Sequence, residues 1–178
     1  MTWLCEERRV PSIDEPVLVG VDEAGRGPVL GPMVYAAFIA PISNAHGLSS
    51  FHFADSKVLS AEKRDELFDK IVQEKEFGWV IRELSAECIS NCMLRKEKYN
   101  LNDLSHDTVI EMIREISLQR KIEQVWIDTV GPPEKYQKKM ESFFPSIKLE
   151  LLNFTGFAFL KRLIRSIQLS LLLQSWPK

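Results

Sequence analysis

VLVGVDEAGRGPVLGPMV, residues 17–34, decides how the rest of the chain is interpreted. Its first part, residues 17–21, is an almost wholly apolar run, which is typical of a strand buried on both faces. The run stops at Asp22 and Glu23, and the glycines and prolines that follow cannot comfortably continue a strand. A second apolar run, residues 33–39, predicts a partner strand. We therefore expect a hairpin-like pair whose first strand ends in acid.

The sequence beyond this pair alternates between helical and extended patterns. Apolar residues that recur at helical spacing predict helices, and short apolar runs predict strands. The predicted helices begin at Ser60 and cover 88–94, 105–119 and 134–143, and the predicted strands cover 77–84, 124–127 and 147–152. This order of elements favours an α/β domain with a mixed sheet.

Carboxylates stand where two of the predicted strands end. Asp22 and Glu23 close the first strand, and Asp128 directly follows the strand at 124–127. Ligand sites in open α/β sheets gather outside the strand ends, so the three carboxylates can converge. Clustered carboxylates repel one another unless they bind a cation, and oxygen-only ligands favour Mg²⁺ or Mn²⁺ over zinc. From spacing alone, it stays open that these acids are turn residues or helix caps.

Composition indicates one globular domain in a reducing compartment. The chain has 178 residues and a formal net charge of −2, so no global basic field points to nucleic acid, although local patches matter more. The cysteines Cys5, Cys88 and Cys92 have no framework spacing, and we interpret the last two as packing thiols on one helix face. There is no apolar signal-peptide core and no apolar run as long as a bilayer span. We expect the nucleus or the cytosol, and no membrane partner.

Asp22 to Val34 resembles very closely the signature of the type 2 ribonucleases H, the ribonuclease HII family, as found in the catalytic subunit of eukaryotic enzymes. Further matches follow in order: Phe53-Ala54-Asp55-Ser56-Lys57, Tyr99-Asn100-Leu101-Asn102, Leu104-Ser105-His106-Asp107, and Asp128-Thr129-Val130-Gly131 with Pro133-Glu134-Lys135-Tyr136. The resemblance covers residues 17–147. It implies a ribonuclease H-like fold and the hydrolysis of RNA in RNA–DNA hybrids with Mg²⁺ or Mn²⁺, leaving 3′-hydroxyl and 5′-phosphate ends.

The resemblance also implies roles for charged residues. Asp22, Glu23 and Asp128 match the metal-binding carboxylates of the family, so we predict that they are catalytic. Lys57 matches a lysine that faces the substrate phosphate, and we expect Ser56 to assist it.

The loop after the first strand matches the family loop that recognises a ribonucleotide beside a deoxynucleotide. Gly25, Arg26 and Gly27 form this loop. Glycines let backbone amides approach closely, and the 2′-hydroxyl is the group that distinguishes RNA from DNA. Arg26 can in addition hold a phosphate through two hydrogen bonds.

Other prominent side chains are interpreted as structural. A general-base role for His106 is conceivable, but its position in the Leu-Ser-His-Asp segment that opens a helix favours capping or packing. Trp79, Trp126 and Phe143 fall on apolar stripes, and we predict that they belong to the core.

The resemblance ends near residue 150. Family members continue with a segment that supplies a fourth carboxylate and a tyrosine at the RNA–DNA junction, and residues 151–178 contain neither. Shifted by one base, Trp176-Pro177 must encode Ala and Ser166-Ile167 can encode Tyr, so the missing segment reappears. We hypothesise that this tail is out-of-frame translation, which the transcript sequence tests. We expect a leader over 1–16, a catalytic domain over 17–150 without its carboxy-terminal helical part, and a divergent tail over 151–178.

The predicted function is endonucleolytic removal of RNA primers and misincorporated ribonucleotides, in DNA replication and ribonucleotide excision repair. The alternative is a catalytically impaired splice or frameshift isoform that at most binds RNA–DNA hybrid. Eukaryotic relatives work as a heterotrimer with two non-catalytic subunits. Because much of that docking surface lies in the part that is missing here, we do not predict assembly for this chain.

Overall fold

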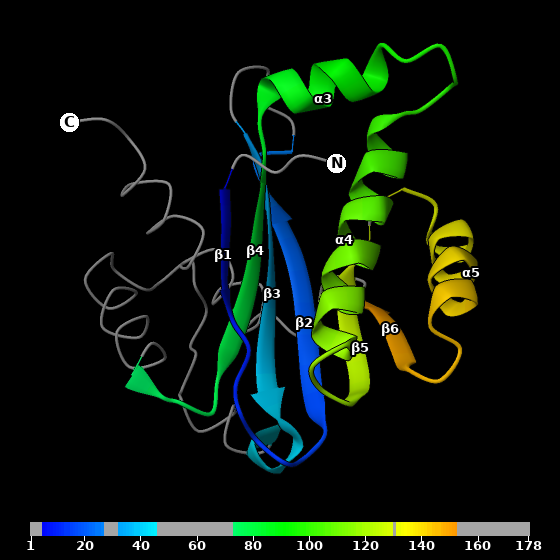
Figure 1. The fold of residues 1–178 in the computed structure, drawn as a ribbon. Coiled ribbons are helices and arrows are strands. Elements are labelled where there is room, and N and C mark those ends of the chain that lie inside the picture. The colour runs from blue at the N-terminus through cyan, green and yellow to red at the C-terminus, as the bar shows by residue number, and fades with distance from the viewer. Residues whose placement is uncertain (1–4, 27–31, 46–72, 130, 153–178) are drawn as a thin grey trace, which may run out of the picture.

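The computed structural model describes residues 5–26, 32–45, 73–129 and 131–152, which form one mixed sheet with helices packed on it (Figure 1). The sheet has six strands in the order β1-β4-β3-β2-β5-β6. The strands are β1 (Cys5–Arg9), β2 (Val17–Ala24), β3 (Met33–Pro41), β4 (Gly78–Leu84), β5 (Ile122–Asp128) and β6 (Lys148–Leu152). The helices are η1 (Ile42–Ala45), α3 (Ala86–Met93), α4 (Leu101–Ser117) and α5 (Pro133–Phe143). The predicted α/β class with a mixed sheet is confirmed.

Several predictions from the sequence lie outside the described residues. They concern Gly27, Ser56, Lys57, the helix that begins at Ser60, and the tail beyond Leu152. These remain predictions, as does the out-of-frame origin of the tail. Within the described part of the chain, every helix is too short or too polar to cross a bilayer.

The centre of the sheet is the predicted pair β2–β3. The two strands run antiparallel with Val21 opposite Ala37, and residues 17–22 of β2 and all of β3 are buried. β2 also pairs with β5, here in parallel, so that Val21 lies opposite Ile127. Both strands therefore point their carboxyl ends toward the same edge of the sheet, one residue before Asp22 and Asp128 respectively.

Helix α4 covers one face of the sheet and supplies much of the core (Figure 1). Fully buried apolar side chains recur along it at helical spacing, and they are Leu104, Val109, Met112, Ile113 and Ile116. The helix begins at Leu101, four residues before its predicted start. Asn100 and Asp103 form a capping box there, which provides partners for the first backbone N–H groups.

Strand β1 was not predicted. It forms an edge of the described sheet and pairs antiparallel with β4, from Cys5 opposite Glu83 to Arg9 opposite Trp79. Arg9 fastens its end, because Nε donates to the Phe77 carbonyl at 3.0 Å and the guanidinium lies 4.7 Å from the centre of the Trp79 ring. Pairing with a formed edge, and not an apolar pattern, makes this segment a strand.

Two of the three aromatic core predictions were wrong. Trp79 is buried, but Trp126 is only half-buried, and its indole Nε1 donates to Glu150 on β6 at 3.0 Å. Phe143 is 42% exposed, with the Arg114 guanidinium 4.8 Å from its ring centre. The two errors share a cause, since an indole N–H or a cation can partner an aromatic ring at the surface.

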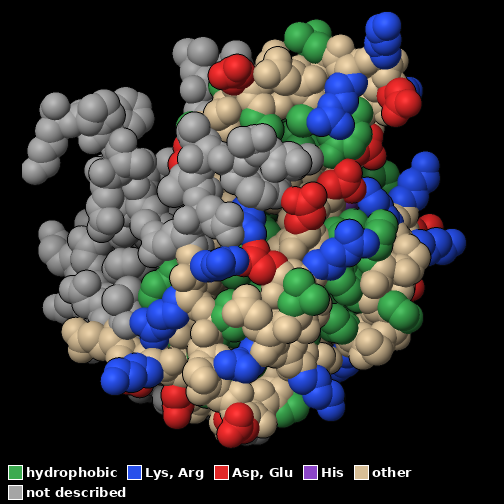
Figure 2. Space-filling view, viewed as in Figure 1, with side chains coloured by type: hydrophobic (Ala, Val, Ile, Leu, Met, Phe, Trp, Pro, Cys, Tyr) green, Lys and Arg blue, Asp and Glu red, His purple; other side chains and the backbone are tan. Residues whose placement is uncertain are grey.

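The cysteines of α3 behave largely as predicted. Cys92 is buried in the core, whereas Cys88 is half-buried, and both are free thiols. The surface in Figure 2 mixes acidic, basic and apolar side chains, and the visible face carries no field of a single sign.

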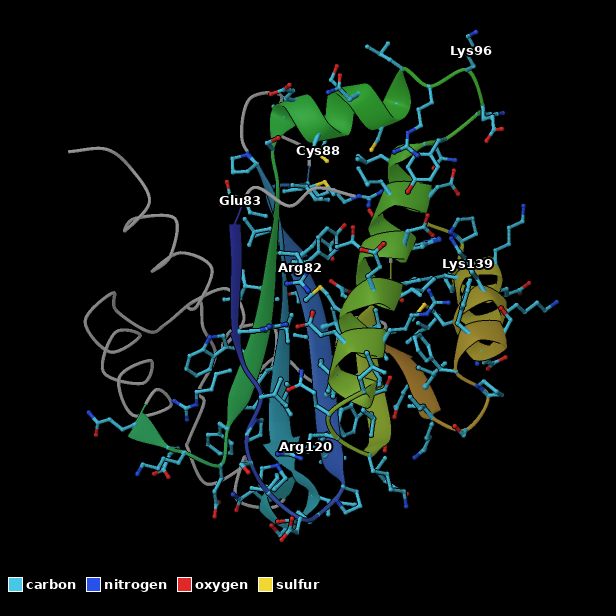
Figure 3. The ribbon with its side chains drawn as sticks, in the orientation of Figure 1. Arg82, Glu83, Cys88, Lys96, Arg120 and Lys139 are labelled. Atoms are coloured by element: carbon cyan, nitrogen blue, oxygen red, sulfur yellow. The ribbon has the colours of Figure 1, made fainter. Side chains whose placement is uncertain are left out.

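Glu115 on α4 joins the helix to two strands. It pairs with the buried Arg82 of β4 and, at 2.7 Å, with the exposed Arg8 of β1. Arg82 reaches from the sheet toward α4 (Figure 3). A buried guanidinium depends strongly on a carboxylate partner, whereas an exposed ion pair contributes little.

We expect Glu115→Ala to lower the free energy of unfolding by about 3 kcal/mol, because it leaves the Arg82 charge buried without this carboxylate. The matched variant Arg8→Ala removes only the exposed partner and should cost less than about 1 kcal/mol. Urea unfolding measures both. Equal effects would show that the buried pair does not hold α4 to the sheet.

Candidate metal centre

Three carboxylates lie together at the carboxyl ends of β2 and β5. Asp22, Glu23 and Asp128 each offer an oxygen, and these oxygens all lie within 4.8 Å of one another. The parallel register of β2 and β5 produces this arrangement, since it brings the ends of two strands from distant parts of the sequence side by side. The convergence expected from the sequence is therefore present in the fold.

The cluster is electrostatically unfavourable without a cation. Asp22 is only 2% exposed, and Glu23 and Asp128 are half-buried. Two unit charges at this spacing repel by about 3 kcal/mol at the effective dielectric constant of a protein surface. Two backbone N–H groups offset part of this: Glu23 N donates to Asp22 Oδ1 at 2.8 Å, and Thr129 N to Asp128 Oδ1 at 2.9 Å. A set of oxygen donors with this charge fits a hard divalent ion such as Mg²⁺ or Mn²⁺.

Two tyrosines are buried close to the acids. Burial raises the pKa of Tyr35 to about 12, with a further rise from the charge of Glu23 and a partial lowering through Ser105. Burial also raises the pKa of Tyr136, and the charges of Tyr35, Glu23 and Asp128 add to it. Both phenols are therefore neutral at physiological pH and add no negative charge to the cluster.

Tyr136 is held in place by its neighbours on α4. Its ring stacks on the buried His106 ring, with centres 3.9 Å apart and planes 8° from parallel. Lys139 on α5 pairs with Asp107 on α4 at 2.7 Å (Figure 3), and Tyr99 also donates to Asp107 at 2.9 Å. The observed contact of His106 is packing, one of the two structural roles favoured by the sequence. The other is not observed, since Asn100 caps the helix.

The turn after β2 requires glycine at its first position. Gly25 has φ +79°, and a Cβ there would lie 2.2 Å from the Pro32 carbonyl oxygen. A side chain would meet both unfavourable backbone torsion and a clash with backbone atoms. This glycine therefore lets the chain turn closely beside the acids.

Arg26 points to helix α4. Its Nη1 donates to Ser105 Oγ at 2.7 Å, and its Nη2 donates to Asn102 Oδ1. The sequence analysis assigned no role to Asn102 or Ser105, although both lie in segments that resemble the family. They are polar residues three apart at the start of a helix whose inward face is otherwise mostly apolar, and that departure from the pattern was the available indication.

We predict that Gly25→Ala lowers the free energy of unfolding by about 2 kcal/mol or more, through strain at positive φ and the clash with Pro32. Urea unfolding measures the loss, with Ser90→Ala at an exposed position of α3 as the control. A Gly25→Ala protein as stable as the wild type would mean that the turn has another conformation.

Binding of Mn²⁺ should raise the melting temperature, by the equivalent of about 2.7 kcal/mol at a hundredfold excess over the dissociation constant. Asp128→Asn should lose most of this shift, yet melt higher than the wild type without metal because one repulsive charge is gone. Glu97→Gln, an exposed acid away from the cluster, should keep the shift. Identical metal shifts in the wild type and Asp128→Asn would exclude the cluster as the binding site.

Solved structures with the same fold belong to ribonucleases H. The ribonuclease H2 of Pyrococcus horikoshii OT3 superposes with a TM-score of 0.68 at 20% identity, over 89% of this chain and 76% of that chain. The ribonuclease HII of Archaeoglobus fulgidus, solved in complex with PCNA, gives 0.70 at 24% identity, over 89% and 73%. A ribonuclease HIII solved with Mn²⁺ gives 0.64 at 17% identity, over 93% and 55%. These likenesses confirm the predicted ribonuclease H-like fold.

Sequence comparison gives the family directly. The model of the family "Ribonuclease HII" matches residues 19–153. The corresponding ribonuclease H2 subunit from Bos taurus is 47% identical over 140 residues, which is 77% of this chain and 46% of the relative. The human subunit is 46% identical over 143 residues, 79% and 48%, and that of Arabidopsis thaliana is 45% identical over 135 residues, 75% and 46%. The chain spans about half the length of these relatives. With most of its residues matched by the family model, the chain belongs to the ribonuclease HII family.

Proposed function

We propose that this chain carries the acidic centre of an endoribonuclease that hydrolyses the RNA strand of RNA–DNA hybrids and cuts at ribonucleotides embedded in DNA. The observation that carries the proposal is the convergence of Asp22, Glu23 and Asp128 within 4.8 Å. Phosphodiester hydrolysis needs charge stabilisation at the phosphate and an activated water. Membership of the ribonuclease HII family supports this reaction over other uses of a carboxylate cluster.

The residues of the chain divide the work between metal binding and substrate reading. Asp22, Glu23 and Asp128 hold the divalent ions and fix them at the end of β2 and β5. Bound there, such ions stabilise the charge of the phosphodiester and supply a nucleophilic water at neutral pH. The products then carry 3′-hydroxyl and 5′-phosphate ends. Mg²⁺ and Mn²⁺ both suit the donor set.

The turn at Gly25 suits the recognition of a ribonucleotide. Gly25 carries no side chain and is exposed, so backbone amides next to the acids are open to a 2′-hydroxyl. We assign Arg26 and Gly27 to the same loop. Ser56 and Lys57 are proposed to support the substrate phosphate, on the strength of their match to the family.

A second candidate function is binding of RNA–DNA hybrid without efficient cleavage. It is favoured by the number of acids, since the described residues bring together three carboxylates and the resemblance implies four. Loss of one charge from such a centre lowers the rate by orders of magnitude without abolishing contacts to the backbone.

Cellular roles are proposed on the family relation alone. They are the removal of RNA primers during DNA replication and the excision of misincorporated ribonucleotides, in the nucleus or the cytosol. Assembly with two non-catalytic subunits would require surfaces of the longer relatives.

The test is cleavage of a DNA duplex with a single embedded ribonucleotide, in Mg²⁺ and in Mn²⁺. We expect cleavage at the ribonucleotide and none of an all-DNA duplex, and a loss of at least about a hundredfold in Asp22→Asn. Glu97→Gln should cleave like the wild type, because this exposed acid lies outside the cluster. If the folded wild type binds the duplex without cutting it, the second candidate function holds. If Asp22→Asn cuts equally well, the cluster is not the active centre.

A further inference from the structure

The guanidinium of Arg26 is engaged at both of its terminal nitrogens. Nη1 donates to Ser105 Oγ at 2.7 Å and Nη2 to Asn102 Oδ1, and the arginine is partly buried in this contact. A guanidinium is a rigid planar fork, so two acceptors at its two ends fix both the position and the orientation of the side chain. The backbone at Arg26, which directly follows the Gly25 turn, is thereby tied to α4.

The Ser105 hydroxyl is prepared to accept. Its proton is donated to the Leu101 carbonyl at 2.8 Å, which leaves an oxygen lone pair for Arg26. Ser105 is only 1% exposed, so its acceptor depends on a protein partner. A buried acceptor left without a donor costs free energy, which favours the bound position of Arg26.

Asn102 also contacts the second loop of the centre. A Cβ on Gly131 would lie 2.9 Å from Asn102 Nδ2, so the glycine packs directly on the face of this amide. Gly131 lies in the loop that follows β5 and Asp128, and it has φ +79°. Asn102 therefore lies between the loop that leaves β2 and the loop that leaves β5.

The first turn of α4 is a firm support for these contacts. Asn100 Oδ1 accepts from Asn102 N at 2.8 Å and from Asp103 N at 3.2 Å, and Asp103 Oδ2 accepts from Asn100 N at 3.0 Å. The fully buried Leu104 anchors the same turn in the core. A capped and anchored turn moves little, so the groups that it holds move little as well.

We propose that Asn102 and Ser105 are positioning residues that act through Arg26. They fix the Gly25 turn beside the carboxylates before substrate arrives, and Arg26 is an anchor of this turn and not a ligand of a substrate phosphate. The positioning role rests on the proposed function, whereas the anchor itself is a property of the fold. Moving Arg26 to a phosphate would abandon the buried Ser105 acceptor and release the turn at the moment of recognition.

A double-mutant cycle on the full chain tests the anchor without any need for activity. Arg26→Ala and Asn102→Ala should each lower the melting temperature by about 3 to 6 °C. The double variant should melt close to Asn102→Ala alone, because the second substitution removes a contact already lost. Asn102→Asp keeps an acceptor for Nη2 and should melt near the wild type.

The matched control combines Arg26→Ala with Asn91→Ala, an exposed asparagine of α3, and these two effects should add. Additive losses in Arg26→Ala with Asn102→Ala would overturn the proposal, whether or not the chain cleaves RNA. Failure of the proposed function would instead show as a stable, coupled wild type without cleavage.

Kinetics on the ribonucleotide-containing duplex separate an anchor from a phosphate ligand. An anchor predicts that Arg26→Ala and Asn102→Ala lower kcat by a similar factor, about ten- to a hundredfold, with the salt dependence of KM unchanged and with rescue by Asn102→Asp. A phosphate ligand predicts that Arg26→Ala alone reduces the slope of log KM against log salt by about 0.9. The second pattern would overturn the proposal.

Discussion

The parallel pairing of β2 with β5 is the constraint on which the rest of the structure depends. β2 has an antiparallel neighbour, β3, on its other side, so only the pairing with β5 brings a second carboxyl end to the same edge. A shift of this register by one residue would turn Asp128 to the opposite face of the sheet and separate it from Asp22. The apolar burial of both strands fixes the register, and through it the hydrophobic core determines the geometry of the acids.

Burial and charge act against each other at this edge. The core needs β2 to be enclosed on both faces, and the chemistry needs the strand to end in carboxylates that cannot all be hydrated. The molecule keeps the nearby groups neutral, as with the phenols of Tyr35 and Tyr136, and uses backbone N–H groups as partners for Asp22 and Asp128. Such a site is less stable than an apolar sheet end, and a bound cation restores part of the loss.

Local patterns in the sequence predicted the central strands and the acid cluster, because each depends on an apolar run followed by a polar stop. The same reasoning failed for β1, whose segment Cys5–Arg9 is mostly charged and becomes a strand only through β4. It also began α4 too late, since the cap at Asn100 was taken as part of a loop. The partners of Arg26 lie 76 and 79 residues further along the chain, and no periodicity relates positions so far apart. Contacts of that kind follow from the packed fold.

Strand β1 has a consequence for how the molecule behaves toward its own copies. Without it, β4 would present a row of unpaired backbone groups beside the hydrophobic β3, and such an edge readily recruits a strand from another chain. The mostly charged sequence of β1 makes a poor template for further strands, and Arg9 closes its end on Trp79. The amino-terminal residues thus protect the sheet from self-association, so an affinity tag or a truncation placed there would change solubility before it changed the distant carboxylates.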